Sequence, residues 1–194
     1  MITVLVEGHS EVESVPLLIR RFLAQSGSYD MTVNRPIRVK RYQVVKSGEL
    51  ERIVRFARLH YPNDRALMLI LDADDDCPKE LAPLLLQRLQ QASGRTCSVV
   101  LARAELESWF LASIESLRGH LGIRMDASPP SDPEEVRAAK GWLTRAMQDR
   151  TYVETDDQPA FAAIFDFNQA YARCRSFRKF CKDIDSILLE LTAT

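Results

Sequence analysis

Short apolar runs alternate with amphipathic segments through the first half of the chain. Residues 2–6, 36–45, 66–71 and 97–101 each have the composition of a strand. The run 66–71 is wholly apolar, as expected of a strand covered on both faces, whereas the arginines of 36–45 indicate an edge strand. Strands that alternate with helices form parallel sheets with right-handed crossovers. The pattern therefore predicts an α/β fold with a mostly parallel four-stranded sheet flanked by helices.

Helix signals lie between and after these runs. Ser10 with Glu13 three residues later predicts a capping box, Ser47 predicts a second N-cap, and Pro78 suits the first turn of a third helix. After about residue 110 the strand signals stop, and the last helix is expected to begin near Ser176. We therefore expect an α/β domain over residues 1–124 and a helical extension over 125–194, packed together as one compact unit.

Composition narrows the classes of function. The chain has 194 residues and a formal net charge of −1, which argues against a uniformly basic nucleic-acid-binding surface but leaves room for a metal-dependent enzyme. No apolar run could span a bilayer and no export leader is evident, so we expect a cytoplasmic protein with no membrane partner. The four cysteines are scattered without a CxxC pair, which predicts reduced thiols and no zinc site.

Acidic residues follow three of the predicted strands. Those at the strand ends, or a few residues beyond them, are Glu7, Glu11, Asp72, Asp74, Asp76, Glu105 and Glu107. The carboxyl ends of parallel strands share one edge, where ligands of open α/β sheets bind. Two carboxylates about 4 Å apart repel by ~4 kcal/mol at an effective dielectric near 20. Such a cluster with no histidine–cysteine set favours a hard cation, Mg²⁺ or Mn²⁺.

Individual positions have sharper expectations. Asp72 and Asp74 are two residues apart, so in extended chain both would reach one ion. Asp76 suits a water-mediated ligand or a solvated turn residue, and Glu11 suits either a metal or the positive end of a helix. The candidates for contacting nucleic-acid phosphates are Lys46, Lys140, Arg175 and Arg178.

Two acidic motifs follow predicted strands: Glu7-Gly8-His9-Ser10-Glu11 after the first strand and Asp72-Ala73-Asp74 after the third. In this order they resemble the toprim domain of topoisomerases, primases and overcoming-lysogenization-defect nucleases. The chain as a whole is also similar to small toprim-like proteins of unknown function, often encoded in bacteria beside AAA-type ATPases. That second resemblance also uses residues 105–111 and 174–177.

The resemblance implies a Rossmann-like toprim fold and a catalytic set of Glu7, Asp72 and Asp74. The implied ligands of Mg²⁺ or Mn²⁺ are Glu7, Glu11, Asp72 and Asp74, to which the acidic pattern adds Asp76 and Glu107. Lys140 is a stand-in for the basic residue that nuclease toprim domains carry late in the domain. The implied activity is metal-dependent cleavage of nucleic acid, DNA rather than RNA, with an AAA-type ATPase partner in bacterial defence.

Two other readings stay open. The chain could be a non-catalytic toprim-like regulatory subunit that docks on an ATPase. It could also be a phospho-acceptor of the receiver type, which likewise carries acids after strand one and an aspartate after strand three. The sequence leaves open a homodimer and the choice between one metal ion and two.

Overall fold

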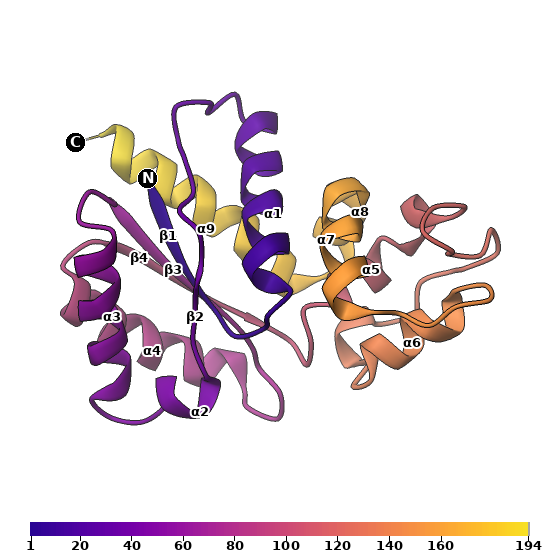
Figure 1. Cartoon of the computed structure of the whole chain (residues 1–194), viewed down its shortest axis with the longest axis horizontal. Coiled ribbons are helices and arrows are strands. Elements are labelled where there is room, and N and C mark those ends of the chain that lie inside the picture. Colours follow the sequence, from indigo (N-terminus) through magenta and orange to yellow (C-terminus); the bar gives the residue numbers. More distant parts are fainter. Residues whose placement is uncertain (194) are drawn as a thin grey trace.

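The computed structural model describes residues 1–193, and its centre is a four-stranded, all-parallel sheet (Figure 1). The strand order is β2 (Ile37–Arg38), β1 (Ile2–Val6), β3 (Ala66–Asp72) and β4 (Thr96–Ala102). This confirms the predicted α/β class, and three of the four strands lie within two residues of their predicted bounds.

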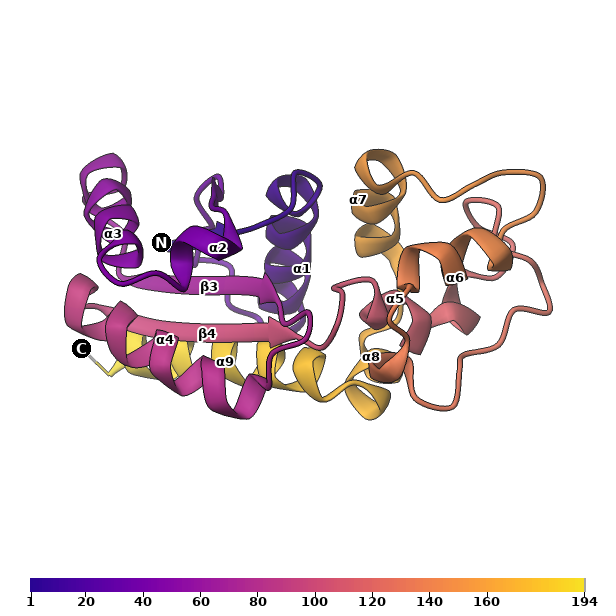
Figure 2. The same cartoon turned by 90° about the horizontal axis from the view of Figure 1, so that it is seen from below.

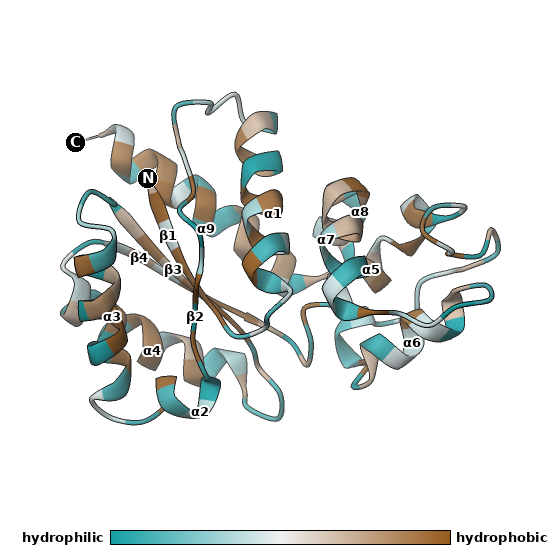
Figure 3. Cartoon of the chain, in the orientation of Figure 1, coloured by the Kyte–Doolittle hydropathy of each residue, from teal (hydrophilic) through white to brown (hydrophobic). Residues whose placement is uncertain are grey.

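Alternate residues of the buried strands pack on opposite faces of the sheet. Val4, Met68 and Val100 belong to a core shared with α1 (Glu11–Gln25) and α9 (Arg175–Thr192). Their neighbours Leu5, Leu69 and Val99 belong to a second core with α3 (Glu49–His60) and α4 (Pro78–Ser93). Strands β1, β3 and β4 are mostly brown in Figure 3, which agrees with a sheet covered by helices on both sides.

The remaining helices lie together beyond the carboxyl ends of the strands, where the arrowheads of β3 and β4 point toward them (Figure 2). They are α5 (Ser108–Ala112), the 3-10 turns η1 (Ile114–Leu117) and η2 (Pro133–Glu135), α6 (Ala139–Ala146), α7 (Glu154–Ile164) and α8 (Phe167–Arg173). Helix α7 packs against α1, and α9 then returns along β4. The helical part thereby places side chains over the edge of the sheet that carries the predicted site.

The second predicted strand is wrong over most of its length. Of residues 36–45 only Ile37–Arg38 form β2, and Arg41–Val44 form the short helix α2. An edge strand has one neighbour, and after Val39 donates to the Val6 carbonyl the chain turns into α2. The turn brings the Arg41 guanidinium to the carbonyls of Asp72 (3.1 Å) and Ala73 (3.2 Å), which a continued strand would not do.

The predicted helix starts are partly confirmed. Pro78 lies in the first turn of α4, and α9 begins at Arg175, one residue before the expected position. Ser10 is the N-cap of α1, as predicted, but the capping box is wrong, because the Ser10 side chain forms no cap hydrogen bond and its hydroxyl donates to Glu154 at 3.1 Å. Ser47 is not an N-cap, since Gly48 holds that position with a φ of +82° that favours glycine.

Two expectations about the chemistry of the chain can be compared with residues 1–193. All four cysteines in this range are free thiols, and Cys174 and Cys181 are buried. No helix in the same range has both the length and the apolar composition needed to cross a bilayer.

Candidate active site

The strand order reverses between β1 and β3. From β1 the chain moves outward to β2, and it then crosses back to place β3 on the other side of β1. In open α/β sheets the reversal of strand order opens a binding crevice at the carboxyl ends of these two strands. Glu7 directly follows β1 and Asp72 ends β3, so both predicted residues lie at this point.

Glu11 in the first turn of α1 folds back over the loop that follows β1. Its Oε2 accepts hydrogen bonds from the backbone N–H groups of Glu7 and Gly8, both at 3.0 Å. A Cβ at position 8 would lie 3.1 Å from the Glu11 Cδ, so a larger residue there would displace the Glu11 side chain by a few tenths of an ångström. Burial raises the pKa of Glu11 to about 7, and the charges of Glu107 and Glu7 add to the shift against the two backbone hydrogen bonds.

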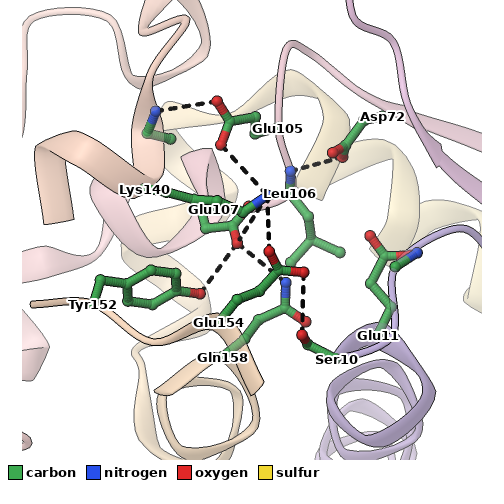
Figure 4. Close-up of polar contacts among 12 residues, drawn as sticks. Ser10, Glu11, Asp72, Glu105, Leu106, Glu107, Lys140, Tyr152, Glu154 and Gln158 are labelled. Carbon is green, nitrogen blue, oxygen red and sulfur yellow. Dashed lines mark hydrogen bonds and ion pairs between the residues drawn. The ribbon is translucent and has the colours of Figure 1, made fainter. Parts of the chain in front are cut away.

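Asp72 links the ends of β3 and β4. Its Oδ1 accepts a hydrogen bond from the backbone N–H of Leu106 at 2.9 Å. Burial raises its pKa well above the ordinary value, and the charges of Glu11 and Glu107 raise it further, while Lys140 opposes the shift. Figure 4 shows the carboxylates of Asp72, Glu11 and Glu107 gathered around one region. We call these three side chains the carboxylate cluster.

Glu107 is the most buried member, with 1% of the residue exposed. Its Oε1 accepts hydrogen bonds from the Tyr152 hydroxyl (3.1 Å) and the Gln158 amide (3.3 Å). Gln158 also accepts the Ser14 hydroxyl at 2.7 Å, which ties α7 to α1. Burial raises the pKa of Glu107 and Lys140 counteracts it. Burial followed by the charge of Glu107 also raises the pKa of Tyr152, so the tyrosine stays a hydrogen-bond donor.

Lys140 on α6 supplies the positive charge of the site. Its Nζ lies 3.1 Å from Glu154 and 3.8 Å from both Glu105 and Glu107 (Figure 4). Burial lowers the pKa of Lys140, but Glu107, Glu154 and Glu105 together raise it above the ordinary value. The ammonium is therefore permanently charged in the physiological pH range.

Glu7 lies at the mouth of this arrangement and is partly exposed. Burial raises its pKa, a backbone hydrogen bond from Arg41 lowers it, and the charge of Asp74 raises it again. Glu7, Glu11, Asp72 and Glu107 are thus connected through their electrostatic interactions, as predicted from their positions at the strand ends.

The expected alignment of Asp72 and Asp74 is wrong. Strand β3 ends at Asp72, and Asp74 has a left-handed φ of +50° in the following turn. The strand alternation therefore does not continue to position 74. The side chains of Asp74 and Asp76 are 59% and 52% exposed and form ion pairs with Arg41, the first at 3.5 Å. Asp74 lies at the rim of the site, close enough to act on the pKa of Glu7.

Residues 6–185 match a family model described as a domain of unknown function, DUF4276. The chain belongs to the DUF4276 family. All residues of the site described above lie within the matched range. No curated protein and no solved structure matches this DUF4276 chain.

The four basic residues predicted to contact phosphates lie in different places of the DUF4276 chain. Lys140 belongs to the site itself, and Arg175 lines a separate cleft. Lys46 is exposed, with its Nζ 5.4 Å from the centre of the Tyr42 ring, and Arg178 donates to the carbonyls of Tyr171 and Ala172. The structure therefore brings one of the four to the carboxylates.

Several side chains of the site have no sequence signal. Arg41 lay in a predicted strand, and Tyr152, Glu154 and Gln158 lie near or in a helix with no motif. Glu154 and Gln158 reach the carboxylates because α7 packs on α1, a contact between residues about 144 positions apart. Arg41 reaches the loop after β3 through the turn into α2. Only an observation that links distant positions could have identified them.

The donor set suits a hard cation in chemical type. Hydrogen bonds within residues 1–193 use Glu11 Oε2 and Asp72 Oδ1, and none of them uses the second oxygen of either carboxylate. Within the same range, no three His, Cys, Asp or Glu side chains lie together in a way that could hold a metal ion. Carboxylates that hold protons because of burial and mutual repulsion can exchange those protons for a divalent ion.

Proposed function

We propose that this chain is a toprim-type nuclease that cleaves nucleic-acid phosphodiester bonds with Mg²⁺ or Mn²⁺. The observation that carries the proposal is the carboxylate cluster: two buried acids, Glu11 and Glu107, and the partly buried Asp72 have raised pKa values and lie at the reversal point of a parallel sheet. Such a concentration of perturbed acids in a crevice is typical of functional sites. The glutamate after β1 and the DxD after β3 agree with the toprim resemblance.

Glu7, Glu11 and Asp72 are the residues that would hold the metal, with Asp74, Asp76 and Glu107 as the outer members of the acidic set. A bound divalent ion supplies positive charge to phosphate oxygens and makes water a better nucleophile. Glu7 has a partly exposed side chain and a raised pKa and directly follows β1, so it is suited to accept a proton from attacking water.

Lys140 has two tasks in this proposal. Its ammonium offsets the charge of Glu105, Glu107 and Glu154, which keeps the acidic site stable without substrate. The same charge lies beside the cluster, where a phosphate of the substrate would be attracted to it. This assigns to α6 the basic residue that the toprim resemblance leads one to expect late in the domain.

The cellular setting follows from the second resemblance. Small toprim-like proteins encoded beside AAA-type ATPases suggest a cytoplasmic role in bacterial defence, with DNA as the substrate and an ATPase as the partner.

The test is cleavage of supercoiled plasmid, linear DNA and RNA by the purified chain in Mg²⁺, Mn²⁺ or EDTA. We expect metal-dependent cleavage that Asp72→Asn lowers at least 100-fold, a loss of about 2.7 kcal/mol of transition-state stabilisation. Glu80→Gln is the matched control, since Glu80 is an exposed acid in the first turn of α4. If wild type, alone and with an ATPase partner, cleaves none of the substrates, the proposal is wrong.

A further inference from the structure

A second hollow lies beside the carboxylate cluster, between the loops that follow β3 and β4, the segment 133–137 and the first turns of α4 and α9. Its volume is about 580 Å³, within the usual range of ligand sites. Five basic side chains line it: Lys79, Arg103, Arg137, Arg175 and Lys179. We call this hollow the basic cleft.

The basic cleft and the carboxylate cluster share one loop. Asp72 at its start accepts a hydrogen bond from Leu106 and belongs to the cluster, whereas Asp74, Asp75 and Asp76 line the basic cleft. Asp74 also acts on the pKa of Glu7, so it borders both. A ligand seated in the basic cleft therefore lies next to the proposed site of chemistry.

Acidic residues also line the basic cleft, but each has a partner. Arg41 pairs with Asp74 and Asp76, Arg137 pairs with Asp75, and Arg103 pairs with Glu135. The carboxylate of Glu134 accepts the backbone N–H groups of Arg175 and Ser176 at the start of α9, both at 2.8 Å.

The cations are less completely paired. Lys179 pairs with Asp183 at 2.6 Å. Within residues 1–193, no carboxylate lies within ion-pair distance of Lys79 or Arg175, so both charges are available to a ligand. The Arg137–Asp75 pair is more than 80% exposed on both sides, and exposed pairs are weak enough for a phosphate to displace the carboxylate.

The other lining residues indicate which part of a nucleic-acid ligand the basic cleft contacts. None of the residues described as lining the basic cleft is aromatic, and the apolar part consists of small or aliphatic residues such as Pro78, Leu101 and Ala104. Strand-binding sites that recognise bases use aromatic stacking, while lysine and arginine recognise phosphates irrespective of sequence. The lining thus suits a phosphate backbone.

We infer that the basic cleft binds the phosphate backbone of the nucleic-acid strand whose phosphodiester reaches the carboxylate cluster. This inference rests on the proposed function for the nature of its ligand. Lys79 and Arg175 are the primary contacts, and Arg137 joins them when phosphate displaces Asp75. Binding is independent of base sequence and falls with salt, because each contact releases counterions from the strand.

The test is the affinity of a fluorescein-labelled single-stranded DNA oligonucleotide, measured by anisotropy in EDTA so that metal-dependent cleavage does not occur. Lys79→Gln with Arg175→Gln is expected to weaken binding at least tenfold. The salt slope should fall by about 1.4, or ~0.7 for each lost contact to a single strand. Arg55→Gln with Lys182→Gln is the matched control, since it removes the same two charge types from exposed positions outside the basic cleft. Circular dichroism verifies that both double variants are folded.

Equal affinity of the two double variants would overturn the inference. So would a labelled mononucleotide that binds as tightly as the oligonucleotide, since the basic cleft would then take a small phosphate ligand instead of a strand. Wild type that binds strands through Lys79 and Arg175 but cleaves nothing would remove the nuclease proposal and keep the basic cleft. If Lys79→Gln with Arg175→Gln leaves cleavage unchanged, the inference about the basic cleft is wrong and the nuclease proposal stands.

Discussion

At the scale of single residues, the environment of each carboxylate decides its chemistry. Glu11 and Asp72 are buried next to other acids and have raised pKa values, whereas Glu51 is ion-paired with Arg88, whose hydrogen bonds lower its pKa to about 2. The residue type is the same in Glu11 and Glu51, and only the neighbours differ. Sequence position at a strand end identified acids that lie close together in the structure, but it could not provide their pKa shifts, which depend on burial and on Lys140.

The raised pKa of Glu11 makes folding stability depend on pH. Its pKa is about 7 in the folded chain and 4.5 in the unfolded chain, so the folded chain holds this proton more tightly. The stabilisation is complete below pH 4.5 and is lost as pH rises through 7, a change of roughly 3 kcal/mol. Urea denaturation in EDTA at pH 5, 6, 7 and 8 is expected to give a falling unfolding free energy, and Glu11→Gln should flatten the profile.

The control in this series is Glu13→Gln on the exposed side of the same helical turn. It should leave the wild-type profile unchanged. If wild type and Glu11→Gln have parallel profiles, the assigned environment of Glu11 is wrong. Addition of Mg²⁺ at pH 8 should restore stability to wild type, because a metal that binds only the folded chain stabilises it by mass action.

The contribution of Lys140 to folding stability should rise with pH, opposite in direction to that of the Glu11 proton. Lys140→Met removes the cation near Glu105, Glu107 and Glu154, so these acids repel one another when ionised. We expect a loss of about 1–2 kcal/mol at pH 8, discounted because the lysine is 42% exposed. The loss should be smaller at pH 5, because burial raises the pKa of Glu107 and favours its neutral form. Lys140→Arg should retain most of the stability, and equal losses at both pH values would contradict this account.

At the scale of elements, the sequence was informative where one face of an element is buried locally. The apolar runs predicted β1, β3 and β4 because a doubly covered strand must be apolar along its length. The structure of residues 36–45 was harder to predict. This segment pairs with only one strand, so its hydrophobic pattern is weak, and Arg41 in α2 forms a long-range contact with the end of β3. The capping box at Ser10 depended on a partner outside the local sequence, since its hydroxyl donates to Glu154, whereas the cap expected at Ser47 is held by the neighbouring Gly48.

Arg41 is the positioning residue of the loop after β3. Its guanidinium donates to two backbone carbonyls and pairs with Asp74 and Asp76, although it lies on α2, more than 30 residues earlier. Arg41→Lys retains the charge but cannot form the same fork. We expect faster amide exchange over residues 73–77 and roughly tenfold weaker metal-dependent cleavage, as befits the loss of a charge-assisted hydrogen bond.

The control is Arg38→Lys, an exposed side chain on β2 whose nearest polar partner is His9 at 3.2 Å. Amide exchange in the loop after β3 should be the same in Arg38→Lys as in wild type. Unchanged exchange in Arg41→Lys would show that the loop holds its conformation without the fork. A cleavage loss without an exchange change would assign Arg41 a direct contact with substrate instead.

At the scale of the whole molecule, the chain between β4 and α9 forms the far wall of the site. Lys140, Tyr152 and Gln158 all come from this part, and the strand ends supply the carboxylates. Neither part contains the site alone. The sequence separated residues 1–124 from a helical extension on the basis of strand signals, but α9 packs along β4 and completes one face of the sheet.

The return of α9 to the sheet predicts a single cooperative unfolding transition. Phe180 on α9 is fully buried against Trp109 and Phe177, whereas Leu189 on the same helix is 70% exposed. Phe180→Ala should lower the unfolding free energy by about 3–5 kcal/mol and shift the transitions of the sheet and of the helical part together, while Leu189→Ala should change it by less than about 0.5 kcal/mol. Fluorescence of Trp109 and Trp142 and far-ultraviolet circular dichroism provide the two probes. Two separated transitions, or equal effects of the two substitutions, would mean that the sheet folds without α9. The strand-end carboxylates could then be formed in a fragment that lacks it.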